Sequence, residues 1–334
     1  ADTIYDLASL TKVTGTTTAA MILVDEGRLN LDAPVVTYLP WWAAGDPAKE
    51  AVTVRQLLLH RAGLPPFRQF YLDIEGRTAY QEAIGDLELE YAAGSSTVYS
   101  DIGLMTMAFI VEEVSGRPLD VFLRERVWEP QGMTDTGFRP SRALRDRIAP
   151  TEIDTFFRNT HVHGVVHDEN AYAMGGVAGH AGLFSTASDL AILAQTLLGG
   201  GSIEGCAQGD SRARGSAADA ICAPSRVGNV RLVAEETLRE FTRRFDGSAS
   251  RGLGWDTPSE RSSAGDYFTE AAFGHTGFTG TSIWIDPELD MFVVLLTNRV
   301  NPSRDNTKHI PLRRAIHDGA ALAITDMEVS LRGR

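Results

Sequence analysis

The chain has 334 residues, of which 43% are hydrophobic and 22% are charged. This balance excludes a disordered protein, a collagen-like repeat and a disulfide-dense scaffold. Its longest apolar run, 291–296, is far shorter than the roughly 20 residues of a membrane-spanning helix. The formal charge of −13 repels nucleic-acid phosphates and anionic lipid, so a small neutral or cationic molecule is the expected partner. Nothing in the sequence fixes the oligomeric state.

The N-terminal region is expected to be helical. Apolar residues recur at helical spacing from Leu10 to Val24 and stop at Gly27. The pattern predicts a helix over 9–26, with Ser9 in its first turn. The same reasoning predicts further helices along the chain, at 52–60, 101–114, about 118–127, 188–198 and 306–324.

Strand patterns appear only near the C-terminus. Segments 281–285 and 291–297 flank a turn at 286–288 and predict a β-hairpin. Helices in the middle of the chain and strands near one end predict an α+β fold.

The expected domain organisation is discontinuous. A sheet-containing part is expected from 1–26 and 246–334, and a mostly helical part from 27–245. Within the helical part, 199–229 is low in large apolar side chains and is expected to be a low-complexity insert. Its cysteines, Cys206 and Cys222, are expected to form a loop disulfide or to stay as unreacted thiols.

A serine and a lysine lie one helical turn apart near the N-terminus. Ser9 and Lys12 project from the same face of the predicted helix, and the chain has only three lysines. A serine hydroxyl becomes nucleophilic when a neighbouring group takes its proton. The helix N-terminus would also offer the Ser9 N–H to a developing oxyanion. The alternative is an ordinary exposed helix turn.

Two further short motifs carry groups of the same chemistry. Tyr99-Ser100-Asp101 precedes a predicted helix and can present a phenol and a carboxylate together. The segment 274–277, Gly-His-Thr-Gly, opens the C-terminal strand region. Small residues at a strand edge let a substrate lie alongside, next to the N–H of Phe278. Each motif alone is more often a turn than a site.

These three elements, in this order, resemble the S-x-x-K, Y-x-N and K-T-G motifs of the serine β-lactamases and penicillin-binding proteins. That family includes class C β-lactamases, D-alanyl-D-alanine carboxypeptidases and esterases of the same fold. Segments between the motifs resemble the family as well, at 31–40, 54–65, 129–133 and 179–186. The resemblance implies a β-lactamase/transpeptidase-like fold, an antiparallel sheet flanked by helices with an inserted, mostly helical domain. It also implies a periplasmic or secreted location.

The resemblance also implies roles for individual residues. Ser9 would form an acyl-enzyme, Lys12 and Tyr99 would share the proton transfer, and the N–H groups of Ser9 and Phe278 would form the oxyanion hole. No metal and no cofactor is expected. The residues expected to contact the substrate are Asp101, His180, His275, Thr276 and Gly277.

Two residues depart from the family's motifs. Asp101 replaces an Asn and adds a negative charge that could keep Lys12 protonated, which would shift the base role toward Tyr99. His275 replaces the Lys of K-T-G and removes a permanent cation for substrate carboxylates. A protonated His275 would restore part of that charge at low pH.

The leading functional hypothesis is a carboxylesterase acting on small or medium acyl esters. A D-amino-acid peptidase, an amidase or a β-lactamase acting on peptidoglycan-like substrates is the alternative among enzymes. A module that binds cell-wall peptides without turnover is the alternative from another class. The intact Ser9, Lys12 and Tyr99 argue against that last reading.

Two other features concern a possible metal site and the strands of the sheet. A cluster of imidazoles and carboxylates could hold a metal, but no zinc motif supports this; its members are His161, His163, His167, Asp168 and Glu169. In the family, a helix and at least two strands precede S-x-x-K, whereas eight residues precede Ser9 here. We therefore expect those strands to be missing and one edge of the sheet to be exposed.

Overall fold

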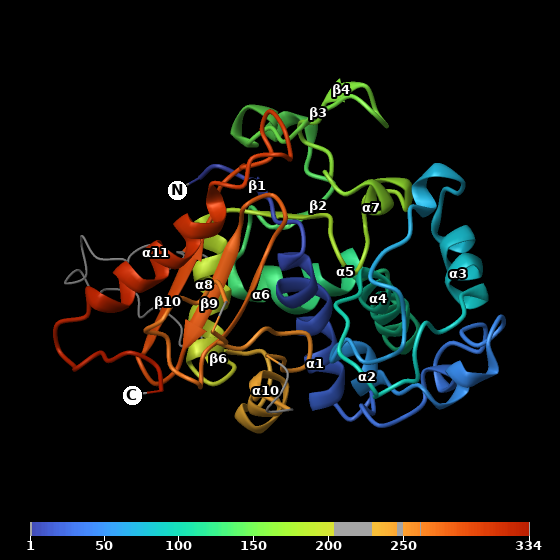
Figure 1. Ribbon diagram of the computed structural model, residues 1–334, viewed down its shortest axis with the longest axis horizontal. Helices are drawn as coiled ribbons and strands as arrows, with labels where there is room; N and C mark the ends of the chain where they lie inside the picture. The colour runs from blue at the N-terminus through green and yellow to red at the C-terminus, as the bar shows by residue number, and fades with distance from the viewer. Residues whose placement is uncertain (1, 204–228, 246–249, 261, 334) are drawn as a thin grey trace.

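The computed structural model describes residues 2–203, 229–245, 250–260 and 262–333 (Figure 1). Most of the expected insert, including Cys206 and Cys222, lies outside these ranges. The described part combines helices with small antiparallel sheets, which confirms the α+β prediction. In that part, no helix is long and apolar enough to cross a membrane.

The main sheet has three antiparallel strands, β8 (Phe273–Thr276), β9 (Ser282–Asp286) and β10 (Met291–Leu295), with β9 in the middle. The predicted hairpin is confirmed, because β9 and β10 pair over their whole length. Side chains alternate across the sheet. Ile283 and Ile285 of β9 therefore enter the main core, whereas Trp284 enters a smaller second core.

One helix covers each face of this sheet (Figure 1). Helix α8 (Ala187–Leu198) packs on β9 and β10 from the side of the main core. Helix α11 (His309–Leu322) lies on the other face, where Ala321 joins Trp284. Helix α8 therefore packs with the sheet, although it lies within 27–245, the range expected to form the mostly helical part. Strand β10 pairs only with β9 among the described residues.

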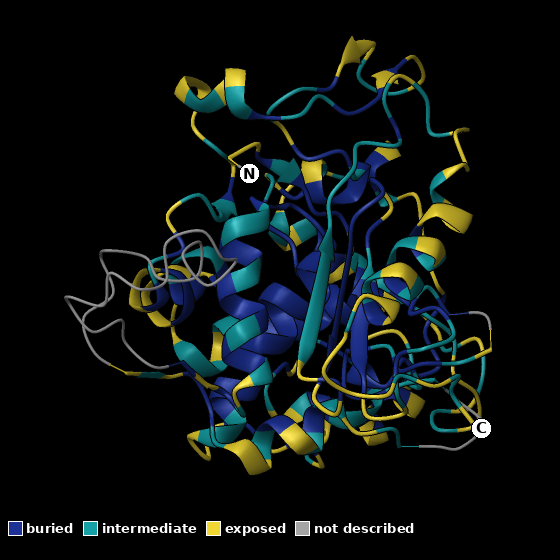
Figure 2. Ribbon diagram, turned by 90° about the vertical axis from the view of Figure 1, so that its left-hand side faces the viewer, coloured by how far each residue is buried: buried dark blue, intermediate teal, exposed yellow. Residues whose placement is uncertain are grey.

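The helix after Ser9 is central to the molecule. It starts at Leu10, runs as a π-helical stretch over Lys12–Thr17, and continues as α1 (Thr18–Asp25). Helix α4 (Asp101–Ser115) packs against α1 and is buried at ten consecutive positions, Ile102 to Val111. Figure 2 shows this buried centre in dark blue, with exposed residues on the peripheral helices and loops.

Local signals explain where these helices begin and end. Thr53 and Gln56 form a capping box at the start of α2 (Val54–Leu58). The Ser100 hydroxyl caps α4, and Gly116 ends it in the left-handed conformation. The region predicted as one helix over about 118–127 is α5 (Leu119–Leu123), a π-helical stretch (Arg124–Trp128) and α6 (Glu129–Gln131).

The remaining elements are short. The other α-helices are α3 (Arg77–Asp86), α7 (Glu169–Ala173) and α10 (Glu235–Thr242). Short 3₁₀ helices cover Val35–Thr37, Pro47–Ala51, Phe70–Leu72 and Arg142–Arg147. A second sheet has the order β1 (Tyr5–Asp6), β5 (Leu183–Ser185), β2 (Gly137–Phe138). The described residues also form two two-stranded sheets, β3 (Ile153–Asp154) with β4 (Thr160–His161) and β6 (Ser202–Ile203) with β7 (Val230–Arg231).

Candidate active site

Ser9 follows a tight turn that a buried carboxylate holds in place. Ala8, directly before it, has a φ of +47°, which is unusual for a residue with a side chain. The Asp6 Oδ1 accepts the Ala8 N–H at 2.8 Å, and its Oδ2 accepts the His167 N–H at 2.6 Å. Burial raises the pKa of the Asp6 carboxyl. Asp6 therefore fixes the turn that presents Ser9 at the start of its helix.

Lys12 lies at the centre of the site and is fully buried. Its Nζ is 2.9 Å from the Ser9 Oγ, 2.8 Å from the Asp101 Oδ1 and 3.0 Å from the His180 carbonyl oxygen. Burial alone would lower the pKa of Lys12, but the adjacent Asp101 and Tyr99 outweigh it, so the pKa of Lys12 is raised. Lys12 thus holds its proton and acts as a donor toward Ser9.

Tyr99 reaches the same point from the loop before α4. The centroid of its ring is 5.0 Å from the Lys12 Nζ. The His60 ring packs 4.7 Å from it and the His275 ring 5.8 Å from it, centroid to centroid. The Arg251 guanidinium lies 5.3 Å from the same centroid. Two cations and two imidazoles therefore surround the Tyr99 ring.

His275 and Thr276 end strand β8, and the sequence passes directly into the turn at Gly277. His275 is only 4% exposed, and its Nδ1 donates to the Thr276 carbonyl oxygen at 2.8 Å. Burial, with the positive charges of Arg251 and Lys12, lowers the pKa of His275 well below its usual value. The structure therefore corrects the expectation of a cationic His275: burial penalises the charged form, so protonation is disfavoured.

Hydroxyl groups join the two turns that carry the expected oxyanion donors. The Thr279 Oγ1 donates to the Asp6 carbonyl oxygen at 2.7 Å, and the Thr281 Oγ1 donates to the Leu7 carbonyl oxygen at 3.0 Å. A Cβ on Gly277 would overlap the Leu7 carbonyl oxygen, so only glycine fits there. The turn carrying Ser9 and the turn carrying Phe278 are thereby held against each other.

The N–H groups of Ser9 and Phe278 donate to no main-chain carbonyl within the described ranges. An oxyanion hole requires such N–H groups, directed at the point where charge develops. The side chain of Phe278 is 47% exposed.

His180 differs from the expectation. Its ring is buried, and its Nε2 lies 2.8 Å from the Asp168 Oδ1. Burial would raise the pKa of Asp168, but His180 outweighs it and the pKa is strongly lowered. The ring is therefore held by Asp168 rather than presented to a substrate, and His180 reaches the site through the carbonyl oxygen that binds Lys12.

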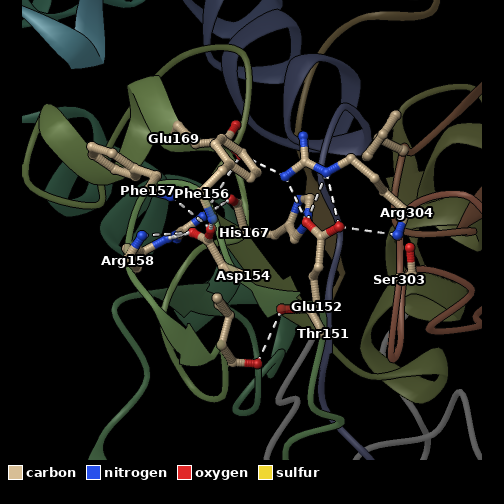
Figure 3. A network of polar contacts seen from close by, with 12 residues as sticks. Thr151, Glu152, Asp154, Phe156, Phe157, Arg158, His167, Glu169, Ser303 and Arg304 are labelled. Carbon is tan, nitrogen blue, oxygen red and sulfur yellow. Dashed lines mark hydrogen bonds and ion pairs between the residues drawn. The ribbon is translucent and has the colours of Figure 1, made fainter.

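Of the cluster at 161–169, His167 and Glu169 belong to a network of ion pairs (Figure 3), whereas the His163 Nε2 donates to main-chain carbonyl oxygens. The His167 Nε2 is 2.9 Å from the Glu152 Oε2, and Arg304 lies within 2.6 Å of both Glu152 and Glu169. These partners lower the pKa of Glu152 despite its burial. The His167 ring also stacks on Phe278, with 5.8 Å between centroids. Among the described residues, no group of three His, Cys, Asp or Glu side chains is arranged to hold a metal ion.

Three residues of the site lie outside the three short motifs: Asp6, His60 and Arg251. Arg251 belongs to a segment distant in sequence from all three motifs, and Asp6 lies in a two-residue strand. His60 carries a weak signal, since it stands just after α2 at the position where a glycine usually closes a helix.

Comparisons with known proteins agree with this geometry. The family model described as Beta-lactamase matches residues 1–318. A protein of Escherichia coli (strain K12) named "Putative D-alanyl-D-alanine carboxypeptidase" is 35% identical over 326 residues, covering 89% of this chain and 69% of its own.

Solved structures share the fold. A penicillin-binding protein homologue from Caulobacter crescentus matches with a TM-score of 0.71 at 23% identity, covering 97% of this chain and 84% of the other. A family VIII carboxylesterase matches with a TM-score of 0.65 at 18% identity, covering 95% and 84%. At these identities the likeness extends to the fold alone.

Proposed function

The chain belongs to the beta-lactamase family of serine hydrolases, and on this premise we propose that it hydrolyses small or medium acyl esters through an acyl-enzyme on Ser9. One observation carries the proposal. The Lys12 Nζ lies 2.9 Å from the Ser9 Oγ while it pairs with Asp101 at 2.8 Å. An ammonium group in that position orients the hydroxyl and leaves proton removal to Tyr99.

The reaction follows from these contacts. The Ser9 Oγ attacks the ester carbonyl carbon as its proton passes to the Tyr99 oxygen, while the phenol proton of Tyr99 passes to the alcohol oxygen of the ester. The N–H groups of Ser9 and Phe278 receive the developing oxyanion. The C–O bond to the alcohol breaks, and the alcohol leaves with the proton from Tyr99. Water then attacks the acyl-enzyme from the Tyr99 side, transfers a proton to Tyr99 and releases the acid and Ser9 Oγ–H.

Two features support esters over anionic peptides. His275 is neutral and buried, so the K-T-G position supplies no cation. Arg304 is already paired with Glu152 and Glu169. A substrate carboxylate gains little at either point, whereas a neutral ester needs no such partner.

A second candidate, a D-amino-acid carboxypeptidase, is favoured by Arg251. Its guanidinium lies beside Tyr99, and its Nη1 is buried with no hydrogen-bond partner in the described ranges. The Arg251 Nε lies 4.0 Å from the Oδ1 of Asp256, the carboxylate that pairs with it. A cation so weakly paired could take the C-terminal carboxylate of a peptide. The name of the Escherichia coli relative points the same way.

Side-by-side turnover distinguishes the two candidates. We expect wild type to hydrolyse p-nitrophenyl esters faster than a D-Ala-D-Ala peptide or a chromogenic cephalosporin. Arg251→Gln should then reduce peptide turnover more than ester turnover, because only the peptide carries a carboxylate. Peptide turnover that exceeds ester turnover and is lost in Arg251→Gln would replace the esterase assignment with the carboxypeptidase. Absence of turnover and of covalent labelling in the folded protein would indicate a binding module.

Asp101→Asn is expected to move the alkaline limb of the pH profile to lower pH. Asp101 raises the pKa of Lys12 above its usual 10.5, and without it the effect of burial lowers that pKa. Because an opposite charge in contact shifts a pKa by about 1–3 units, the alkaline limb of kcat/KM should fall by at least about one unit. The stabilising effect of the raised pKa is present below pH 10.5, so the variant should also be less stable at neutral pH.

The control for this experiment is Asp32→Asn, which removes a carboxylate paired with Arg55 away from the site. Its pH profile should match wild type. An Asp101→Asn profile whose acid limb moves instead, with the alkaline limb unchanged, would show that Lys12 works as the free amine and contradict the proposed division of roles.

A further inference from the structure

His60 follows the C-cap of helix α2, Leu59, in a backbone conformation that glycine normally takes. His60 has a φ of +56°. Its N–H donates to the Leu57 carbonyl oxygen at 3.1 Å, and the Arg61 N–H donates to the Gln56 carbonyl oxygen at 2.8 Å. This pair of bonds is the Schellman ending, whose left-handed residue is usually glycine and sometimes asparagine. A histidine in this conformation suggests a functional role for its side chain.

His60 makes hydrogen bonds to the main chain directly before and directly after Tyr99. The His60 carbonyl oxygen accepts the Val98 N–H at 2.9 Å, and its Nδ1 accepts the Ser100 N–H at 3.1 Å. Val98 and Ser100 are the two neighbours of Tyr99 in sequence. The His60 ring itself packs against the Tyr99 ring with 4.7 Å between centroids. One residue therefore fixes the backbone before and after Tyr99 and covers one side of its ring.

The protonation state of His60 follows from the same contacts. An Nδ1 that accepts a hydrogen bond carries no proton, so the neutral ring bears its hydrogen on Nε2. His60 is 2% exposed, and burial with the positive charges of Arg251 and Lys12 lowers its pKa well below the usual value. The acceptor is thus present at neutral pH.

We propose that His60 is a positioning residue for catalysis, which holds the Tyr99 phenol beside Lys12 by binding the main chain on both sides of it. The inference rests on the proposed function, since it assigns His60 to the proton transfer of the Ser9 acylation. Within the described part of the chain, His60 makes no hydrogen bond to Ser9 or to Lys12. Its effect on the reaction therefore passes through Tyr99.

A matched pair of variants tests the Nδ1 contact. His60→Gly and His60→Asn both relieve the left-handed backbone and both remove the imidazole ring. The Asn Oδ1 occupies nearly the position of the histidine Nδ1 and can accept the Ser100 N–H, whereas glycine offers no acceptor. Because a displacement of about 1 Å in a reacting group costs about 100-fold in rate, we expect His60→Gly to slow acylation by about 10- to 100-fold. His60→Asn should stay within about 5-fold of wild type.

The rate to measure is acylation of Ser9 by a fluorophosphonate, together with kcat and KM for a p-nitrophenyl ester. The loss in His60→Gly should appear in kcat, with KM within about 3-fold of wild type, because Tyr99 takes part in chemistry rather than in ground-state binding. Both variants reacting at the wild-type rate, or both being slowed equally, would overturn the inference. Wild type itself failing to acylate would instead overturn the proposed function.

A measurement on the unmodified protein covers the case in which the glycine variant does not fold. Nitrogen-15 NMR of histidine-labelled wild type should show His60 neutral, with an unprotonated Nδ1, from pH 6 to 8. A proton on Nδ1 in that range would exclude the bond from Ser100 and overturn the inference without any variant.

Discussion

Ser9→Ala is expected to abolish ester turnover and covalent labelling together. Without the hydroxyl no acyl-enzyme can form, and loss of a serine nucleophile costs about 10⁶-fold in kcat in enzymes of this type of chemistry. The hydrogen bond from the Lys12 Nζ to the Ser9 Oγ is lost as well. Steady-state turnover of a p-nitrophenyl ester, and peptide mass mapping after fluorophosphonate treatment, measure the two effects. The label should map to Ser9 in wild type and be absent from the variant.

Ser141→Ala is the matched control. Ser141 caps a short helix on the surface, so the same substitution there removes a hydroxyl without touching the site. It should leave turnover and labelling unchanged. A label that persists on another residue of Ser9→Ala, or residual turnover above about 1% of wild type, would mean that a different nucleophile carries the reaction.

Lys12→Met is expected to have the second largest effect, on activity and on stability at once. Methionine keeps much of the volume but removes the ammonium that contacts Ser9, Asp101 and the His180 carbonyl. Loss of the ammonium that orients the Ser9 hydroxyl should cost about 100-fold in kcat/KM, the effect of a displacement of about 1 Å in a reacting group. Because Asp101 then lacks its buried partner, the free energy of unfolding should fall by about 3 kcal/mol. Chemical denaturation and ester kinetics on the same preparation measure both.

The double variant Lys12→Met/Asp101→Asn separates the two effects. Removing the second charge should recover much of the lost stability, since no buried carboxylate is then left unpaired. Activity should not recover, because the donor to Ser9 is still missing. Recovery of activity together with stability would show that Lys12 serves only the fold.

The sequence predicts the parts of the fold that have regular and long patterns. Ser100 and Gly116 mark the two ends of helix α4. Two strand patterns on either side of a turn predict the β9–β10 hairpin. By contrast, β1, β5 and β2 contain two or three residues each, too few for a repeating pattern. The π-helical stretch after Ser9 also has no sequence signature, because it keeps the helical pattern of apolar residues.

The candidate site divides in the same way. Ser9, Lys12, Tyr99 and the strand end at His275 come from three short motifs, and the structure places them in one cluster. Arg251 could not be predicted, because its position beside Tyr99 depends on chain folding between distant segments. The neutral state of His275 also depends on burial, which the motif alone does not reveal.

The bonds from Thr279 to Asp6 and from Thr281 to Leu7 join residues 273 and 274 positions apart in the chain. Contacts of such separation form late, because a very long loop must close before they are made. On a ribosome, the turn that carries Ser9 is synthesised long before the turn that carries Phe278. The nascent chain therefore exposes Ser9 before the turn of Phe278 can be held against it, and the two turns come together only after the C-terminal segment has folded.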